Sequence, residues 1–352
     1  MLRFILKRIF YGVLVIFGVV LVVFFLFHAL PGDPVAMMAG QRTDLATREA
    51  ITKDLGLDQP ISTQLMLYLG DLSPLSVESL TKENKAKYNY QVVMPWGASR
   101  GLVLKKPYLR RSFQTYKRVD EIIWDNVGST FWLALTAISF ASILGIFFGL
   151  IAALRQNTFW DHFLVASSVL GISVPSFVAA IIIAMIFGYY LSDYTGLNLT
   201  GQLWVTHPMY GRQLHLENLI LPALTLGIRP LSIIVQLTRS SMLDVLNQDY
   251  MRTARAKGLP FYKVVLKHGL KNALNPVITA VSGWLASLMA GAFFVEFIFD
   301  WKGLGFVTLK AVQSLDFPVV MGSVLFIAVV FVVINIFVDI LYAAIDPRVR
   351  LN

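Results

Sequence analysis

The chain has 352 residues, of which 56% are hydrophobic and only 14% charged, and its mean hydropathy is +0.66. A water-soluble domain of this length could not cover so much apolar surface with polar side chains, so the composition indicates an integral membrane protein in a lipid bilayer. The net charge of +9 does not indicate a nucleic-acid partner, because the basic residues fall mostly in loops, and the absence of cysteine excludes disulfides and thiolate metal sites.

Six runs are long enough to cross a bilayer as helices, and Arg229 in the fourth is the one formal charge within them. About 20 helical residues cross the roughly 30 Å of hydrocarbon, and lipid requires the backbone polar groups to bond within the segment. The first run follows three basic residues but lacks a cleavage-site pattern, so we predict that it is retained. The predicted spans are 9–30, 127–154, 163–192, 219–238, 272–295 and 317–338.

Residues 31–126, between the first two spans, form a segment too long for a simple connection. Residues 44–55 have helical character, and residues 88–93 alternate as a short strand does. We therefore expect a small external lid or collar with structure of its own.

The orientation follows from the lysines and arginines of the short loops. Thirteen lie on the side of the N-terminus and three on the opposite side. The long external segment is not counted, because segments of that length are translocated largely regardless of their charge. Both termini are predicted to be cytoplasmic.

A basic stretch at 239–275, between the fourth and fifth spans, has clear helix-ending signals. Asp249 is a good N-cap, the residues up to Lys257 are helix formers, Gly258 can adopt the left-handed C′ conformation, and Pro260 prevents the helix from continuing. The pattern predicts a short, firmly ended helix outside the bilayer.

One face of this predicted helix is narrow and modest in bulk. Met251, Ala254 and Gly258 fall at positions i, i+3 and i+7, so they could pack into a groove on a partner protein. Basic residues lie to the sides, where they could meet acidic residues of that partner, and anchoring to the membrane surface is the alternative. These basic residues are Arg252, Arg255 and Lys257.

The order Arg252-Thr253-Ala254, then Gly258 and later Asn275-Pro276, resembles the cytoplasmic EAA coupling loop of ABC importer permeases. That loop begins Glu-Ala-Ala and closes on Leu-Pro, so this chain departs from the pattern at both ends. Other motifs, in order along nearly the whole chain, are similar to the first permease subunit of dipeptide, oligopeptide or nickel importers. They lie at 31–34, 55–60, 70–72, 171–177, 221–223, 301–305 and 346–350, and the match is poorest at 73–118.

The resemblance implies an all-α, six-helix type I ABC importer permease of the bacterial inner membrane. Its parts would be the first helix (1–30), the external collar (31–126), a five-helix core (127–346) and a tail (347–352). It further implies coupling to an ATPase through Tyr250, Arg252, Thr253, Ala254, Arg255, Ala256 and Gly258.

The implied partners are a second homologous permease, two P-loop ATPases and an external solute-binding protein that delivers peptides. The chain has no Gly-x-x-x-x-Gly-Lys-Ser/Thr pattern, so ATP and Mg²⁺ would be bound by the ATPases. We expect no cofactor, no metal site and no enzymatic activity in this chain. The sequence leaves open whether the cargo is a dipeptide, an oligopeptide, nickel or another chelate.

Arg229 is the most unusual residue within a span, because an intramembrane charge is by default a functional hypothesis. It could line the translocation path and attract a peptide carboxylate. Pro230 follows it and leaves carbonyls unbonded, so the favoured interpretation is that Arg229 binds those carbonyls or pairs with Glu296. Glu296, the second candidate path residue, lies near a span end where a carboxylate could reach water.

Small residues at 171–175 and at Gly283, Ala286, Ala290 and Gly291 could allow close helix contacts within the chain or with a second subunit. Rival functions remain open. A secondary transporter or channel would act without an ATPase, but intramembrane acid pairs and filter-like motifs are missing. The Gly-x-Ser-x-Gly match at 97–101 lacks the strand-turn-helix setting of a hydrolase.

Overall fold

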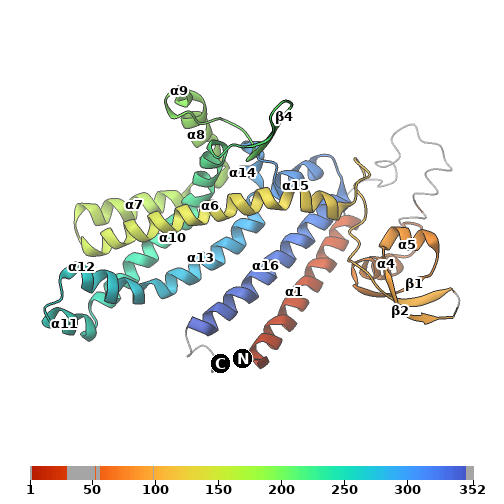
Figure 1. Cartoon of the computed structure of the whole chain (residues 1–352), viewed down its shortest axis with the longest axis horizontal. Helices are drawn as coiled ribbons and strands as arrows, with labels where there is room; N and C mark the ends of the chain where they lie inside the picture. Colours follow the sequence, from red (N-terminus) through yellow and green to blue (C-terminus); the bar gives the residue numbers. More distant parts are fainter. Residues whose placement is uncertain (1, 30–51, 53–55, 98, 346–352) are drawn as a thin grey trace. The chain divides into compact units, whose positions relative to one another are not determined.

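The computed structural model describes residues 2–29, 52, 56–97 and 99–345 (Figure 1). The chain divides into two compact units. The first comprises Met1–Ile16, Asn126–Leu309 and Ile327–Asn352, and the second Phe17–Asp125 and Lys310–Phe326. Apart from residue 52, the predicted helix at 44–55 lies outside the described residues, as do the motifs at 31–34 and 346–350 and the predicted tail.

Among the residues that the structure describes, four helices are long and apolar enough to cross a membrane. They correspond to the first, second, fourth and sixth predicted spans, so these helices are confirmed. They are α1 (Leu2–Ala29), α6 (Val119–Leu154), α10 (Glu217–Leu246) and α16 (Phe317–Ile345).

The third predicted span, 163–192, is wrong as a single helix. It consists of α7 (Phe159–Ser173), α8 (Ser176–Ile183) and the π-helical segment η1 (Ala184–Tyr190), and the chain bends by 107° between α7 and α8. Val174 is extended, with a ψ of 126°, because the ring of Pro175 disfavours helical geometry at the preceding residue. The segment is a fifth crossing only if both arms of this broken helix count as one span.

The fifth predicted span, 272–295, is shorter than expected. α13 (Lys271–Gly291) fills most of it but is not among the helices that qualify by length and composition. The backbone leaves helical geometry at Ala292, with a φ of −79° and a ψ of 8°, before α14 (Phe293–Ile298) begins. The prediction of one uninterrupted helix here is therefore corrected to two.

α10 is the central helix of the first unit and packs against α7, α8 and α13. A Cβ at Gly149 of α6 would lie 2.6 Å from the Val235 carbonyl oxygen in α10, and one at Gly171 of α7 would lie 2.6 Å from Ser232 Oγ. Only glycine allows the helices to approach this closely. The predicted close approach at Gly171 is confirmed.

The small residues of α13 differ among themselves. Ala286 is buried, whereas a Cβ at Gly283 would meet no atom within 4 Å. The surroundings of Ala290 and Gly291 lie outside the described part of the chain. Gly283 is therefore not needed for packing within this chain.

α1 and α16 run side by side near the two ends of the chain (Figure 1). A Cβ at Gly12 would lie 2.7 Å from Val332 Cγ1, and Arg8 Nε lies 3.1 Å from Asp339 Oδ2. The remaining elements between the spans of the first unit are α9 (Ser192–Thr195), β4 (Trp204–His207), β5 (Gly211–Leu214) and the start of α15 (Leu304–Gln313).

The second unit contains a small α/β element within the predicted collar. Three antiparallel strands pair in the order β1-β3-β2, and β2 begins only at Gln91 because Asn89, in left-handed geometry, ends the preceding helix. The strand predicted at 88–93 is thus displaced. The elements are α4 (Ile61–Leu72), β1 (Leu75–Ser79), α5 (Lys82–Tyr88), β2 (Gln91–Trp96) and β3 (Arg100–Leu104).

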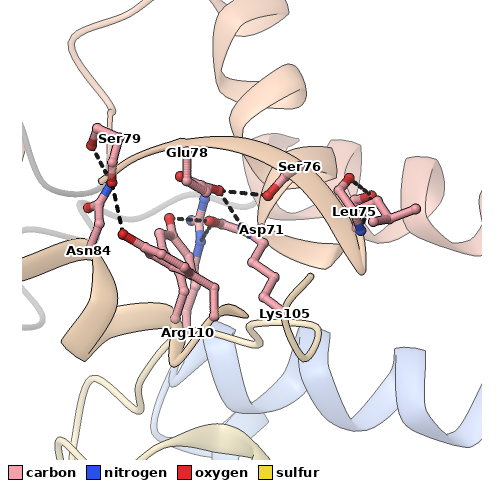
Figure 2. Close-up of polar contacts among 11 residues, drawn as sticks. Asp71, Leu75, Ser76, Glu78, Ser79, Asn84, Lys105 and Arg110 are labelled. Carbon is pink, nitrogen blue, oxygen red and sulfur yellow. Dashed lines mark hydrogen bonds and ion pairs between the residues drawn. The ribbon is translucent and has the colours of Figure 1, made fainter. Parts of the chain in front are cut away.

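Polar contacts hold this element together (Figure 2). Lys105 Nζ lies 2.6 Å from Glu78 Oε1 and 3.8 Å from the centre of the Tyr88 ring, and the Tyr88 hydroxyl donates to Asp71 Oδ1 at 2.8 Å. Burial raises the pKa of Tyr88 well above its usual value, and the Asp71 carboxylate adds to the increase. The hydroxyl therefore remains protonated as the donor at any physiological pH.

Candidate functional site

The basic stretch after α10 folds into the predicted short helix, α11 (Asp249–Ala256). Its start is displaced by one residue, because Gln248 rather than Asp249 occupies the N-cap position and makes no side-chain cap bond. Its end is as predicted. Gly258 has a φ of +75°, its backbone N–H donates to the Arg255 carbonyl at 2.9 Å, and Pro260 then precedes α12 (Phe261–Lys263).

The face of α11 that we predicted to enter a partner groove is instead buried within the chain. Met251 is 0% exposed and Ala254 7% exposed, and both pack against Val264 of the π-helical segment η2 (Val264–Leu270). The prediction is wrong because the chain folds back after α12 and supplies the apolar partner itself. Only Gly258 of the three predicted residues is exposed.

The opposite face of α11 is accessible. Six of the seven predicted coupling residues are exposed, and Ala254 is the exception. We call the six exposed residues the coupling surface: Tyr250, Arg252, Thr253, Arg255, Ala256 and Gly258.

Aromatic side chains border the coupling surface and orient it. The guanidinium of Arg255 lies 5.7 Å from the centre of the exposed Phe261 ring, and the Tyr250 hydroxyl accepts a hydrogen bond from Asn272 Nδ2 at 3.0 Å. Arg252 lies 3.8 Å from Asp249, one helical turn before it. The surface thus combines two arginines with exposed rings, a composition suited to acidic and apolar groups on another protein.

A continuous layer of side chains connects α11 to the spanning helices. A Cβ at Gly269 of η2 would lie 2.6 Å from Met242 Cε of α10 and 3.2 Å from Met251 Cε of α11. Met242 is fully buried and packs in a cluster with Ala153 of α6 and Ala273 of α13. Because such close-packed contacts resist compression, we expect a displacement of α11 to be transmitted to α10, α6 and α13.

Sequence reasoning missed an ion pair between α7 and α10. Asp161, whose side chain is 2% exposed, receives hydrogen bonds from Arg239 Nε at 2.5 Å and from Nη2 at 2.7 Å, and the Asn157 backbone N–H donates to it at 2.9 Å. The lone carboxylate before the third predicted span was the available signal. The Asp161–Arg239 ion pair fixes α7, the first arm of the broken third span, to α10.

The structure does not bring Arg229 and Glu296 together. Arg229 is exposed on α10 and has no hydrogen bond or ion pair with any residue that the structure describes. It therefore binds neither of its two expected partners, which were the Glu296 carboxylate and the carbonyls that precede Pro230. Both interpretations are corrected. An exposed guanidinium on the central helix is instead available to a ligand or to a second subunit.

Glu296 is 0% exposed, contrary to the expectation that its carboxylate reaches water. Its Oε1 accepts a hydrogen bond from Thr130 Oγ1 at 2.6 Å, and its Oε2 accepts one from the Phe306 backbone N–H at 2.9 Å. A Cβ at Gly303 would lie 2.5 Å from the same Oε2, so the glycine is required for the carboxylate to fit. Its contacts are structural, and a role in the path stays a prediction.

The roles predicted for this region are docking and passage. Within the described ranges, no group of three histidine, cysteine or acidic residues could hold a metal ion. The candidate elements for these roles are the coupling surface, the packed layer behind it and the exposed Arg229, and their functions stay predictions.

Comparisons with known proteins find matches along nearly the whole chain. A family model for the binding-protein-dependent transport system inner membrane component matches residues 145–351, and a model for the N-terminal part of such membrane components matches residues 1–134. The dipeptide transport system permease protein DppB of Escherichia coli K12 is 34% identical over 368 residues, covering 99% of each chain. The glutathione transport system permease protein GsiC of the same strain is 34% identical over 350 residues, again covering 99% of each.

A solved structure shares the fold. The inward-facing MetNI methionine ABC transporter aligns with a TM-score of 0.50 and 13% identity, covering 64% of this chain and 97% of that chain. At this identity the likeness concerns the fold alone.

Proposed function

This chain belongs to the family of binding-protein-dependent inner membrane transport components, and we propose that it is the permease subunit of an ATP-driven importer of peptides. The dipeptide and glutathione permeases that it resembles support peptide as the cargo. A second, homologous permease completes the translocation path. An external solute-binding protein delivers the peptide, and both termini of this chain are cytoplasmic.

The observation that carries the proposal is that α11 exposes the coupling surface on one face while its other face is buried within the chain. Two P-loop ATPases bind ATP and Mg²⁺, and one of them receives α11, with acidic residues opposite Arg252 and Arg255. Met251 and Ala254 hold α11 from behind, so a movement of the ATPase moves the helix rather than detaching it.

Transport then follows from a population shift. ATP binding to the partner changes the relative free energies of the inward-open and outward-open states, and the layer from Met251 through Gly269 to Met242 carries the movement to α10. The exposed Arg229 lies on that same helix and attracts the carboxylate of a passing peptide. The chain itself breaks no bond.

Co-purification tests the proposal. We compare the tagged wild-type chain, an Arg252→Glu/Arg255→Glu variant and a matched Lys263→Glu/Lys267→Glu variant, whose reversed charges are equally exposed but outside the coupling surface. The first variant is expected to lose P-loop ATPases and ATPase activity but to keep the second permease, whereas the matched variant keeps both.

Two outcomes contradict the proposal. Equal loss of ATPases in both variants means that docking depends on general charge rather than on the coupling surface. A wild-type chain that purifies alone in mild detergent and moves solute when reconstituted by itself is a secondary transporter.

A further inference from the structure

Most of the net charge of the chain is concentrated in one external segment. Residues 73–118 contain six lysines and four arginines but only two glutamates and no aspartate, a formal charge of +8 against +9 for the whole chain. Lys105 pairs with Glu78, so Glu83 is the one exposed acid among the described residues of this segment. Its exposed basic residues are Lys82, Lys85, Arg100, Lys106, Arg111 and Lys117.

The same segment presents an apolar sheet face. Directly opposite residues of antiparallel strands share a face, and the register pairs Leu75 with Leu104, Val77 with Leu102, and Leu102 with Met94. Trp96 lies opposite Arg100 in the next pair on this face. The apolar side chains on it are 47–56% exposed, and they are Leu75, Val77, Met94, Trp96 and Leu104. We call these five residues the apolar sheet face.

The other face of the sheet is covered by the chain itself over β1 and β3, whereas Val92 of β2, which a β-bulge places on the face opposite to Met94, is 48% exposed. Val103 is 0% exposed, and on the same face Glu78 Oε1 accepts hydrogen bonds from Ser76 Oγ at 2.9 Å and from the buried Lys105 Nζ at 2.6 Å (Figure 2). The sheet is therefore held from one side, while a large apolar surface on the other side faces outward. Exposed apolar surface surrounded by polar residues indicates an interaction site.

The sheet is tied to the end of a membrane-spanning helix within the same unit. His28 Nε2 in the last turn of α1 lies 2.8 Å from Gln64 Oε1 of α4, and the rings of Phe24 and Tyr68 stack with centroids 5.8 Å apart. α4 joins the sheet through Asp71, whose carbonyl accepts from the Tyr108 backbone N–H at 2.8 Å. The sheet is thus fixed near the membrane surface rather than held on a long tether.

We propose that the apolar sheet face lies on the membrane surface on its own side of the bilayer, with the exposed lysines and arginines of residues 73–118 bound to phosphates of anionic lipids. Trp96 suits the headgroup level, where one part of a side chain is apolar and the other wet. An exposed aliphatic face in a strongly basic segment matches a membrane surface, where the acyl chains are apolar and the headgroups of anionic lipids are negatively charged. A polar, acidic protein would satisfy the charges but would leave the apolar residues exposed.

The absence of cysteine makes a site-specific test direct. Met94→Cys places a spin label on the apolar sheet face, and Val92→Cys places one on the opposite face of the same strand, at a similar exposure of 48% against 54%. The full chain is reconstituted in nanodiscs of zwitterionic lipid with or without phosphatidylglycerol. Accessibility to lipid-soluble oxygen and to a water-soluble nickel chelate is measured at each position, and circular dichroism confirms that both variants are folded.

With phosphatidylglycerol, the label at position 94 is expected to be accessible to oxygen and shielded from the chelate, while the label at position 92 remains accessible to the chelate. Raising the salt from about 0.1 M to about 1 M, which shortens the Debye length from roughly 10 to roughly 3 Å, is expected to abolish the difference. Each of the changes Lys82→Gln, Lys85→Gln and Lys106→Gln should weaken the contact about fivefold.

Three results overturn the proposal. If the label at position 94 remains accessible to the chelate in anionic nanodiscs, the face does not contact lipid. If both positions respond alike, the contact is not made by this face. If the label becomes shielded only when a solute-binding protein is added, the face is a protein docking site.

Discussion

Gly258 ends α11 with a φ of +75°, and no atom lies within 4 Å of the position that a Cβ would take. Replacement by alanine therefore costs backbone strain alone, roughly 1–2 kcal/mol. We expect Gly258→Ala to reduce ATP-dependent uptake, because α11 can relieve the strain only by changing its last turn. Gly211→Ala is the matched control, with a φ of +71° and equally open space in the β4–β5 turn. It should lower the thermal unfolding temperature similarly while uptake is unchanged; equal uptake in both variants contradicts the prediction.

Thr130 and Glu296 form a buried contact whose loss leaves polar groups unsatisfied. The hydroxyl donates to Glu296 Oε1 and accepts from the Leu304 backbone N–H at 2.8 Å. Thr130→Val removes both contacts, and we expect the free energy of unfolding to fall by about 1–3 kcal/mol. Thr279→Val on the exposed side of α13, where the hydroxyl bonds only a carbonyl of its own helix, should leave stability unchanged. Thermal unfolding in detergent measures both, and equal midpoints would show that the contact is unimportant.

At the scale of elements, the Asp161–Arg239 pair fixes α7 to α10. Arg239→Ala leaves a carboxylate that is 2% exposed with a backbone N–H as its remaining partner, and removing one member of a buried pair costs about 3 kcal/mol. We expect a lower unfolding temperature, with only partial rescue by Arg239→Lys because an ammonium cannot make both bonds in the same fork. Full rescue by lysine would show that charge alone matters. The exposed Arg8–Asp339 pair between α1 and α16 provides a comparison that should cost less.

Two glycines in helices allow separate tests of packing within the chain and of packing against another chain. A Cβ at Gly171 would lie 2.6 Å from Ser232 Oγ and 2.8 Å from Ile228 Cγ2, so Gly171→Leu is expected to destabilise this chain by itself. Gly283 has open space on α13, so Gly283→Leu should leave unfolding unchanged. If the second permease packs there, Gly283→Leu lowers its recovery on co-purification. Unchanged recovery places the subunit interface elsewhere.

Features set by neighbouring residues were predictable, whereas features set by distant contacts were not. The end of α11 follows from Gly258 and Pro260, which impose their geometry locally. The burial of Met251 could not be predicted, because it depends on η2 folding back onto α11. Thr130 and Glu296 are 166 residues apart, and nothing in the pattern around either one indicates the other.

The broken third span shows a different limit. Pro175 was visible in the sequence, but an apolar run of that length also fits a tilted helix. Pro175 interrupts the helix, but the bend of 107° also depends on distant contacts, since Gly171 rests against α10 just before the break. The coupling residues and the candidate path residues remain predictions, because the chain is described without its partners.

At the scale of the whole molecule, the role that we propose for Arg229 connects the fold to the cargo. Its exposed guanidinium has no hydrogen bond or ion pair among the described residues, and it lies on α10, the helix that we propose receives the movement of α11 through Met242 and Gly269. A fixed positive charge beside the path favours a peptide with a free carboxylate over one with an amidated end, since the attraction requires the negative charge.

We therefore expect Arg229→Gln to reduce the uptake of a free dipeptide toward the level of its amidated form. Arg229→Lys, which keeps the charge, should retain the preference. The ratio of the two uptake rates in proteoliposomes of the complete transporter is the measurement. Unfolding midpoints should be nearly equal, because the exposed side chain makes no hydrogen bond or ion pair with the described residues. A ratio unchanged in Arg229→Gln means that the guanidinium faces the second subunit rather than the path.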